Sequence, residues 1–363
     1  MDTNLRPARV PLPGSIIRAE LDARGWTQKD LARIMGRPEK TISQIVNGHK
    51  QITPETALEL AAAFGTSAEL WLNLEARYRL REAEGEHGTS EIERKGRLYD
   101  MLPISELQKR GWIDEHEAID DLEREVRSFL GIARLTARPR VLVSLRQSAV
   151  RVPEVGAEVA WACRVEQLAS AQQIGPFDRQ QLADAIPALA RLSVEPEGVT
   201  KVPAFLARLG VHFVIVPHLD RTYLDGAALG AEGRPIVALT LRYDRIDHFW
   251  FTLLHEQAHI VAGHEGGYLD DLDQAPTTPE EVEANQMAQD WLLDPEALAR
   301  FVAATAPYFS EKRIRAFAAE QGRHPGIVVG RLHHEGHTDH AHLRKLQVTV
   351  RHYLEPWIDT ARP

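Results

Sequence analysis

The sequence predicts a mainly helical protein with several domains, in which a small N-terminal module of five helices precedes a later α+β domain. The chain has 363 residues, whereas a single hydrophobic core stops growing at roughly 250–300 residues. Short apolar stripes at helical spacing, separated by Gly and Pro, fill residues 13–84. Strand-like runs come much later, at 211–218 and 235–243, around a Gly-containing turn region and just before a long apolar helix.

Composition restricts the functional class. The chain is 44% hydrophobic and 26% charged, with a single cysteine, Cys163. It has no apolar run near the ~18 residues of a membrane span, and its first residues lack the apolar segment of a secretory signal. One cysteine forms no internal disulfide. We therefore expect a cytoplasmic protein without membrane contact, in which Cys163 is a small buried apolar residue.

The net charge of −9 is unevenly distributed along the chain. Residues 1–60 hold nine Lys and Arg against seven Asp and Glu, so the remainder carries −11. Phosphate repels such an acidic body but not a mildly basic head. Any contact with DNA is therefore expected in the N-terminal module.

Two helices joined by a very short turn are predicted between residues 27 and 48. Thr27 can cap the helix QKDLARIM, with Asp30 three residues later, and Gly36 can end it. Pro38 fits the first turn of the next helix, EKTISQIVNG. So short a joint forces a steep angle, which is the helix-turn-helix arrangement that places its second helix in the major groove of DNA.

The polar side chains of the second helix are predicted to point outward, because Ile42 and Ile45 share an inward face. The alternative is an ordinary solvated face on a small helical domain. The candidate DNA contacts, including one at the start of the preceding helix, are Gln28, Lys40, Thr41, Ser43, Gln44 and Asn47.

Residues 13–80 resemble the Xre or lambda-repressor type of helix-turn-helix. The stretches PGSIIRAELDARGWTQKDLA and ITPETALELAAAFGTSAELWLNLEARY are similar to the HigA antidote branch. This resemblance implies a lambda-repressor-like five-helix fold, double-stranded operator DNA as a partner and a homodimer bound to two half-sites.

The middle of the chain, residues 85–200, is read as charged helical segments. One of them carries Ile119, Leu122, Val126 and Leu130 on a single stripe. We expect this region to link the two ends of the molecule or to pair two chains.

The run HFWFTLLHEQAHIVAGHEG, residues 248–266, is either an ordinary buried helix with polar residues or a metal site. His255 and His259 lie four residues apart, hence on one helical face, where both imidazoles can bind one Zn2+. Glu256 is turned about 100° from His255 and sits beside the metal, as a general base requires. Two imidazoles and a carboxylate are costly to bury in an apolar helix unless they bind something, which favours the metal site.

A catalytic zinc site needs a third protein ligand and an open position. Glu265 stands where the pattern H-E-x-x-H-x-x-G-x-x-H would place a third histidine, so that arrangement is excluded. Glu283 lies next to the apolar face of the following helix and is expected to turn toward the histidines. Glu280 and Glu281 are expected in the solvated first turn of that helix.

Other histidines with a candidate role are His324 and a cluster near residue 340. His324 is a candidate transition-state donor, with helix capping or packing as the alternative. The histidines of RLHHEGHTDHAHLRK are expected to lie in a solvated tail; they are His333, His334, His337, His340 and His342.

Residues 200–335 resemble the ImmA/IrrE metallopeptidase family in the stretches LTLRYDRIDHFWFTLLHEQAHIVAGH, EEVEANQMAQDWLLDP and HPGIVVGRLHHEG. The resemblance implies a zincin-like, gluzincin-type domain in which His255, His259 and Glu283 hold Zn2+ and Glu256 is the base. Met287 departs from the family, which has an aromatic residue after the E-A-N segment. Members of the family cut helix-turn-helix repressors, so a protein substrate is implied.

Four regions are expected: a DNA-binding module at 1–84, a helical linker or dimerisation region at 85–200, a metallopeptidase domain at 201–335 and a tail at 336–363. The expected function is transcriptional regulation of the repressor, antidote or stress-response type, combined with zinc-dependent cleavage of a repressor-type protein. The peptide is expected to add as a strand along an edge such as 235–241. One alternative is an antitoxin or repressor whose zinc fold binds a toxin or senses a signal without turnover. Another is a peptidase whose head recruits only proteins.

Overall fold

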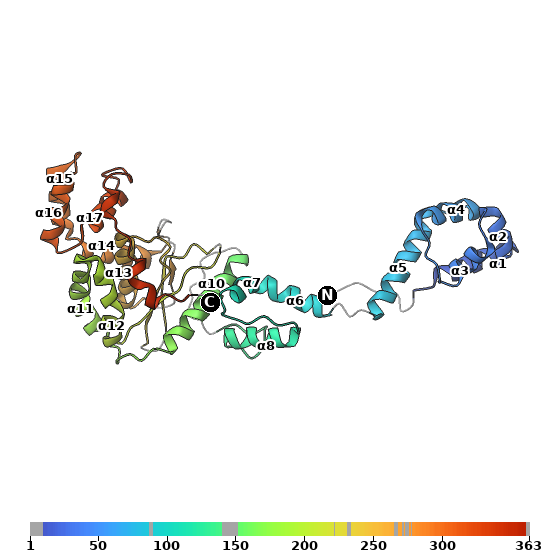
Figure 1. The fold of residues 1–363 in the computed structure, drawn as a ribbon, viewed down its shortest axis with the longest axis horizontal. Coiled ribbons are helices and arrows are strands. Elements are labelled where there is room, and N and C mark those ends of the chain that lie inside the picture. Colours follow the sequence, from blue (N-terminus) through green and yellow to red (C-terminus); the bar gives the residue numbers. More distant parts are fainter. Residues whose placement is uncertain are drawn as a thin grey trace. The chain divides into compact units, whose positions relative to one another are not determined.

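The chain folds into two compact units, Met1–Arg94 and Lys95–Pro363, each with its own core (Figure 1). The computed structural model describes residues 10–86, 90–139, 152–220, 222–230, 234–264, 268–270, 272, 276 and 278–360. Within those ranges, no helix is both long and apolar enough to cross a lipid bilayer.

The N-terminal unit is a bundle of five helices, as the sequence predicted. Thr27 and Asp30 form the expected capping box at the start of the second helix, and Gly36 ends it in a left-handed conformation. Pro38 is the N-cap of the third helix, so that helix begins one residue later than expected. Ile42 and other apolar residues form the core. The helices are α1 (Pro13–Arg24), α2 (Gln28–Met35), α3 (Glu39–Val46), α4 (Pro54–Phe64) and α5 (Ala68–Glu86).

The C-terminal unit is mainly helical and contains a small mixed sheet. The boundary between the two units falls within α6 (Ser90–Met101). The next helices of the C-terminal unit are α7 (Ile104–Lys109), α8 (Ile119–Leu130), α10 (Val152–Ser170), α11 (Arg179–Arg191) and α12 (Val202–Arg208). After the first three strands come α13 (Ile246–Ala262), α14 (Pro279–Leu292), α15 (Pro295–Thr305), α16 (Glu311–Gln321), α17 (Pro325–His334) and α18 (Arg351–Leu354). Its strands are β1 (His212–Ile215), β2 (Gly226–Leu229), β3 (Ile236–Leu239) and β4 (Tyr268–Asp270).

The strand order is β1-β3-β2-β4, with β1 parallel to β3 and the other two pairs antiparallel. β3 is therefore an inner strand. The expectation that residues 235–241 offer a free edge is wrong, because Ile236–Leu239 are already paired with β1 and β2 on both sides. The expected turn around Gly226 is instead strand β2, whose sequence GAAL has little strand propensity of its own.

Both faces of the sheet are buried under helices. Alternate residues of β1 point to opposite sides, so that Phe213 packs in the core with α11, α13 and α14, whereas Val214 packs with α8 and α10. The indole of Trp161 on α10 donates a 2.9 Å hydrogen bond to the carbonyl of Val216 at the end of β1. The sheet is thus the middle layer of the C-terminal unit.

The helices between the two ends of the chain belong to this unit. The stripe of Ile119, Leu122, Val126 and Leu130 is present on α8, and it is buried in the core that also contains Val214 of the sheet. The interpretation of 85–200 as a linker therefore does not hold for α8 and α10.

The final residues, expected to form a separate tail at 336–363, are packed on the C-terminal unit from Leu346 onward. In the histidine-rich segment before them, His334, His337, His340 and His342 are exposed, as expected. Leu346, Val350 and Leu354 are buried, and Ile358 forms a bridge to Ile215 of β1. The carboxylate of Asp359 accepts hydrogen bonds of 2.8–2.9 Å from Arg164 on α10 and from the indole of Trp112 after α7. The final segment is therefore part of the fold.

In the histidine-rich segment, His333 is buried, contrary to the expectation, and the exposed His342 is hydrogen-bonded to the rest of the unit. His333 is 5% exposed, and its Nε2 lies 3.0 Å from the carbonyl of His342. Nε2 of His342 lies 2.7 Å from the carbonyl of Phe309. These contacts hold the segment after α17 against the unit.

Candidate metal centre and nucleic-acid interface

α13 is the structural element that carries the candidate metal centre. It follows β3, packs on β2, β3, α14 and α17, and ends at Gly263, whose φ of 74° suits a glycine cap. Its residues from Thr252 to His259 are all buried. The polar residues of the HEQAH run therefore lie inside the protein, as the sequence predicted.

His255, His259 and Glu281 bring their donor atoms together. The Nε2 atoms of the two histidines are 3.1 Å apart, and the Glu281 oxygens lie 3.4 Å from Nε2 of His255 and 3.5 Å from Nε2 of His259. The edges of a tetrahedron with ~2.1 Å metal–ligand bonds are about 3.4 Å long. Two imidazoles and one carboxylate at these separations could hold a zinc ion and leave a fourth position open.

The third candidate ligand is Glu281 rather than the expected Glu283. Seven residues separate Glu281 from the buried Ala288, which places both within about 20° on the helix, whereas Glu283 is about 140° away from Ala288. The side chain of Glu281 is 16% exposed and that of Glu283 is 60% exposed. The expectation of a solvated Glu281 is therefore wrong, and the spacing to the small residue Ala288 was the signal that could have found it.

Glu283 contacts the cluster only through a neighbour. Its Oε2 lies 3.3 Å from Nε2 of His264, and Nδ1 of His264 lies 3.0 Å from Nδ1 of His259. A partner on the second ring nitrogen fixes the orientation and tautomer of a ligating imidazole. Glu283 and His264 therefore support His259 from behind.

Glu256 is completely buried beside this cluster, as expected for its place in the helix. Its carboxylate lies against Gly226 of β2. A Cβ at Gly226 would stand 2.3 Å from Oε1 of Glu256 and 2.8 Å from a methyl carbon of Thr252. A larger residue here would displace the side chains of Glu256 and Thr252, which is one reason for a glycine inside a strand.

His324 caps a helix, which was the alternative to its expected role as a transition-state donor. It is the N-cap of α17, and its Nδ1 accepts the backbone N–H of Gly326 at 3.1 Å. Burial lowers the pKa of its imidazole, which keeps the ring neutral and able to accept this hydrogen bond.

Cys163 is buried on α10, and its burial raises the pKa of the thiol to about 12. A thiol in this state is not a nucleophile near neutral pH, because only the thiolate attacks.

The candidate DNA-contacting residues lie on and beside α3. Asn47 is already engaged, because its Oδ1 accepts a 2.6 Å hydrogen bond from Arg18 on α1 and its Nδ2 donates to Ser43. Arg18, which the sequence analysis did not identify, thus contacts the C-terminal end of α3. Lys40 and Asn47 are exposed, and the half-exposed candidates are Gln28, Thr41, Ser43 and Gln44.

The α1 and α3 helices approach each other very closely. A Cβ at Gly14 would stand 1.9 Å from the carbonyl oxygen of Val46, so the two backbones are in direct contact.

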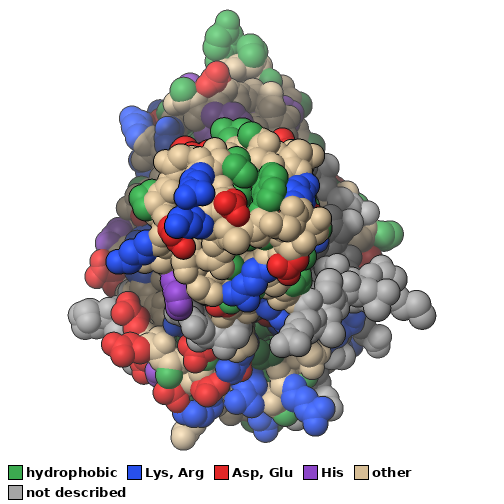
Figure 2. Space-filling model, turned by 90° about the vertical axis from the view of Figure 1, so that its right-hand side faces the viewer, with side chains coloured by type: hydrophobic (Ala, Val, Ile, Leu, Met, Phe, Trp, Pro, Cys, Tyr) green, Lys and Arg blue, Asp and Glu red, His purple; other side chains and the backbone are tan. Residues whose placement is uncertain are grey.

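On the face shown in Figure 2, Lys and Arg side chains are interspersed with Asp and Glu side chains. Charge alone therefore does not mark out a binding surface on that face.

Comparisons with known proteins identify relatives of the N-terminal module. Residues 17–71 match the family model described as helix-turn-helix. An uncharacterized HTH-type transcriptional regulator, YddM of Escherichia coli (strain K12), is 34% identical over 90 residues, which are 25% of this chain and 96% of that protein. Antitoxin HigA-1 of Vibrio cholerae is 39% identical over 74 residues, which are 20% of this chain and 67% of that protein.

Solved structures give similar matches. An addiction module antidote protein of the HigA family from Coxiella burnetii is 36% identical and covers 23% of this chain and 90% of its own, with a TM-score of 0.22. The Pseudomonas aeruginosa antitoxin HigA, solved with the higBA promoter, is 32% identical with 23% and 90% coverage and a TM-score of 0.22. Each of these four proteins covers at most a quarter of this chain.

The close approach of Gly226 to Glu256 predicts a stability difference between two glycine substitutions. Gly226→Ala is expected to lower the free energy of unfolding of the C-terminal unit by about 1–3 kcal/mol, because the added methyl group overpacks a buried site. Gly96→Ala, on helix α6 with no atom within 4 Å of the added Cβ, is expected to be neutral or stabilising by up to about 1 kcal/mol. Urea unfolding followed by far-UV circular dichroism measures both; equal effects would refute the described contact.

Proposed function

The N-terminal module of this chain belongs to the helix-turn-helix family, and from that premise we propose that the protein is a DNA-binding transcriptional regulator of the repressor or antitoxin type whose C-terminal unit is a zinc-dependent endopeptidase. The observation that carries the enzymatic half is the convergence of His255, His259 and Glu281 beside the buried Glu256. The expected substrate is a repressor-type protein.

The DNA-binding half is supported by the arrangement of α2 and α3. A short turn joins the two helices, and α3 presents Lys40, Thr41 and Gln44 at least partly to solvent. A lysine suits phosphate, whereas a glutamine carboxamide can pair with the edge of adenine in the major groove. Proteins of this type bind paired half-sites as dimers, so a homodimer on double-stranded operator DNA is part of the proposal.

For the peptidase half, the residues that would hold zinc are His255, His259 and Glu281. Bound there, zinc would polarise a peptide carbonyl and make an attacking water more acidic. Glu256 follows His255 directly and is buried against Gly226, so its carboxylate is held in one place. It would take the proton from the water and pass it to the leaving amine.

A second candidate function is a DNA-binding antitoxin whose zinc fold binds a toxin or senses a signal without cleaving anything. It is favoured by the length of one relative, since the N-terminal quarter of this chain covers 96% of the YddM regulator. In that protein the module makes up nearly the whole chain. The C-terminal unit could then modulate DNA binding.

The choice of third ligand predicts different zinc affinities for two neighbouring variants. Glu281→Gln removes a carboxylate from the donor cluster and is expected to weaken zinc binding by at least about 100-fold. Glu283→Gln alters only the support behind His264 and is expected to weaken binding by no more than about tenfold. Competition against a chromophoric chelator gives both constants. A larger loss for Glu283→Gln would restore the original assignment.

Catalysis is tested by Glu256→Gln, which removes the general base but no zinc ligand. The variant is expected to retain one zinc per chain and to lose cleavage by at least about 100-fold, within the range that general-base catalysis supplies. The assay is gel electrophoresis of helix-turn-helix repressors encoded near the gene, incubated with each protein. Zinc binding without cleavage by either protein would favour the second candidate function.

DNA recognition by α3 is tested by Gln44→Ala. Loss of one bidentate contact is expected to cost about 1–3 kcal/mol, or roughly 5- to 150-fold in affinity for the DNA upstream of the gene. Asn73→Ala on the exposed side of α5 is the control and is expected to bind like the wild type. Fluorescence anisotropy at several salt concentrations provides the affinities, and a wild type without salt-dependent binding would exclude a DNA partner.

A further inference from the structure

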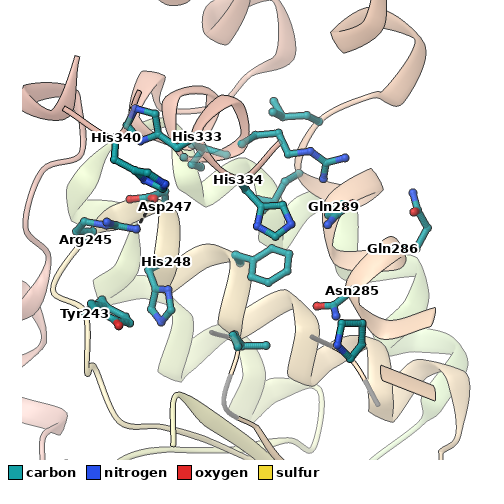
Figure 3. Close-up of a pocket in the computed structure, with 18 of the residues that line it drawn as sticks. Tyr243, Arg245, Asp247, His248, Asn285, Gln286, Gln289, His333, His334 and His340 are labelled. Carbon is teal, nitrogen blue, oxygen red and sulfur yellow. Dashed lines mark hydrogen bonds and ion pairs between the residues drawn. The ribbon is translucent and has the colours of Figure 1, made fainter. Parts of the chain in front are cut away.

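A pocket of about 720 Å³ lies between α13, α14 and α17, and its volume is in the range of ligand sites. In Figure 3, Tyr243 and His248 lie on one side of it, and Asn285 and Gln289 lie on the other. Apolar side chains from all three helices also line it, among them Phe251, Val282, Leu292 and Ile327. His333, His334 and His340 contribute imidazoles to the lining.

The pocket residues His248 on α13 and Asn285 on α14 lie on the helix faces that carry the candidate zinc ligands. His248 is seven residues before His255 on α13, and Asn285 is four residues after Glu281 on α14, so each pair shares a helix face. The ring of Phe251 lies between them on α13, with its centroid 6.1 Å from that of His255. The pocket therefore lies beside the metal centre, along the same faces of α13 and α14, although none of the three candidate ligands lines it.

His248 is held in a fixed orientation on its side of the pocket. Its Nε2 lies 3.1 Å from Oδ1 of Asp225, whose side chain is completely buried. The other oxygen of Asp225 accepts the backbone N–H of Leu272 at 2.9 Å. A carboxylate only accepts, so Nε2 of His248 is the donor and Nδ1 is the nitrogen left for the pocket.

The charged groups of the pocket are neutralised within the protein. Arg245 lies 3.1 Å from Asp247, and Arg331 lies 2.7 Å from Glu335. Asp247 also accepts a 2.8 Å hydrogen bond from Gln347. What remains for a ligand is an apolar surface flanked by carboxamides and by the imidazoles of His248, His333, His334 and His340. Such a lining suits an uncharged polypeptide segment with exposed main-chain amides.

We propose that this pocket binds the polypeptide substrate next to the bond that is cleaved, and that His248, oriented by Asp225, positions the substrate main chain. The inference rests on the proposed peptidase function. Seven helical residues span about 10 Å, which corresponds to three residues of an extended chain at ~3.3 Å each. His248 therefore contacts the substrate main chain up to three residues from the reacting carbonyl. An apolar side chain of the substrate would then lie over Phe251.

The test uses zinc-binding hydroxamates on the zinc-loaded full-length protein, measured by isothermal titration calorimetry. Acetohydroxamate reports the metal centre alone. Two alanyl-leucyl-alanine hydroxamates, one with the peptide before the chelating group and one with it after, report the groove in either chain direction. At least one of them is expected to bind the wild type more than tenfold more tightly than acetohydroxamate.

Three variants separate positioning from folding. His248→Ala is expected to lose this gain while binding zinc and acetohydroxamate as the wild type does. In Asp225→Asn the amide oxygen is needed to accept the backbone N–H of Leu272, so the amide nitrogen faces Nε2 of His248. The imidazole then has to accept at Nε2 and carry its proton on Nδ1, and the variant is expected to lose the gain as well. His352→Ala, at an exposed position outside the pocket, is expected to keep it.

The outcomes distinguish the two proposals. A wild type that binds neither zinc nor acetohydroxamate overturns the proposed peptidase, and the pocket assignment with it. If zinc and acetohydroxamate bind but peptide extension adds no affinity, only the pocket assignment is overturned. Retention of the full gain by His248→Ala, with the gain present in the wild type, removes the positioning role.

Discussion

The burial of two imidazoles and a carboxylate inside an apolar helix is the constraint on which the C-terminal unit depends. Such groups are costly to remove from water unless they are bound to something. Their neighbours are accordingly small where space is needed: Gly226 makes room for Glu256, and Ala288 lies on the face of α14 that carries Glu281. The packing of α14 on α13 brings the carboxylate of Glu281 to the two histidines.

Features set by local spacing could be predicted from the sequence. The capping box of Thr27 and Asp30, the glycine ends of the first helices and the stripe on α8 all follow from residues a few positions apart. The same holds for His255 and His259, because a helix places residues four apart on one face. The DNA-contacting face of α3 follows by the same geometry and stays a prediction.

Features set by distant contacts could not be predicted in the same way. Glu281 and Glu283 differ by two positions, and the choice between them depends on which face of α14 meets α13. β2 has a sequence of glycine, alanine and leucine, so its pairing with β3 is what makes it a strand. The helices of the middle region looked like a linker because their partners in the sheet lie many residues further along the chain.

The contacts of Asp359 have a consequence for biosynthesis. This carboxylate accepts hydrogen bonds from Arg164 and Trp112, and Ile358 forms a bridge to Ile215 of β1. The larger unit therefore cannot close until residues 358 and 359 have been translated. The N-terminal bundle involves only early residues and can fold while synthesis continues. A regulator built in this order has a folded head before its second half is complete.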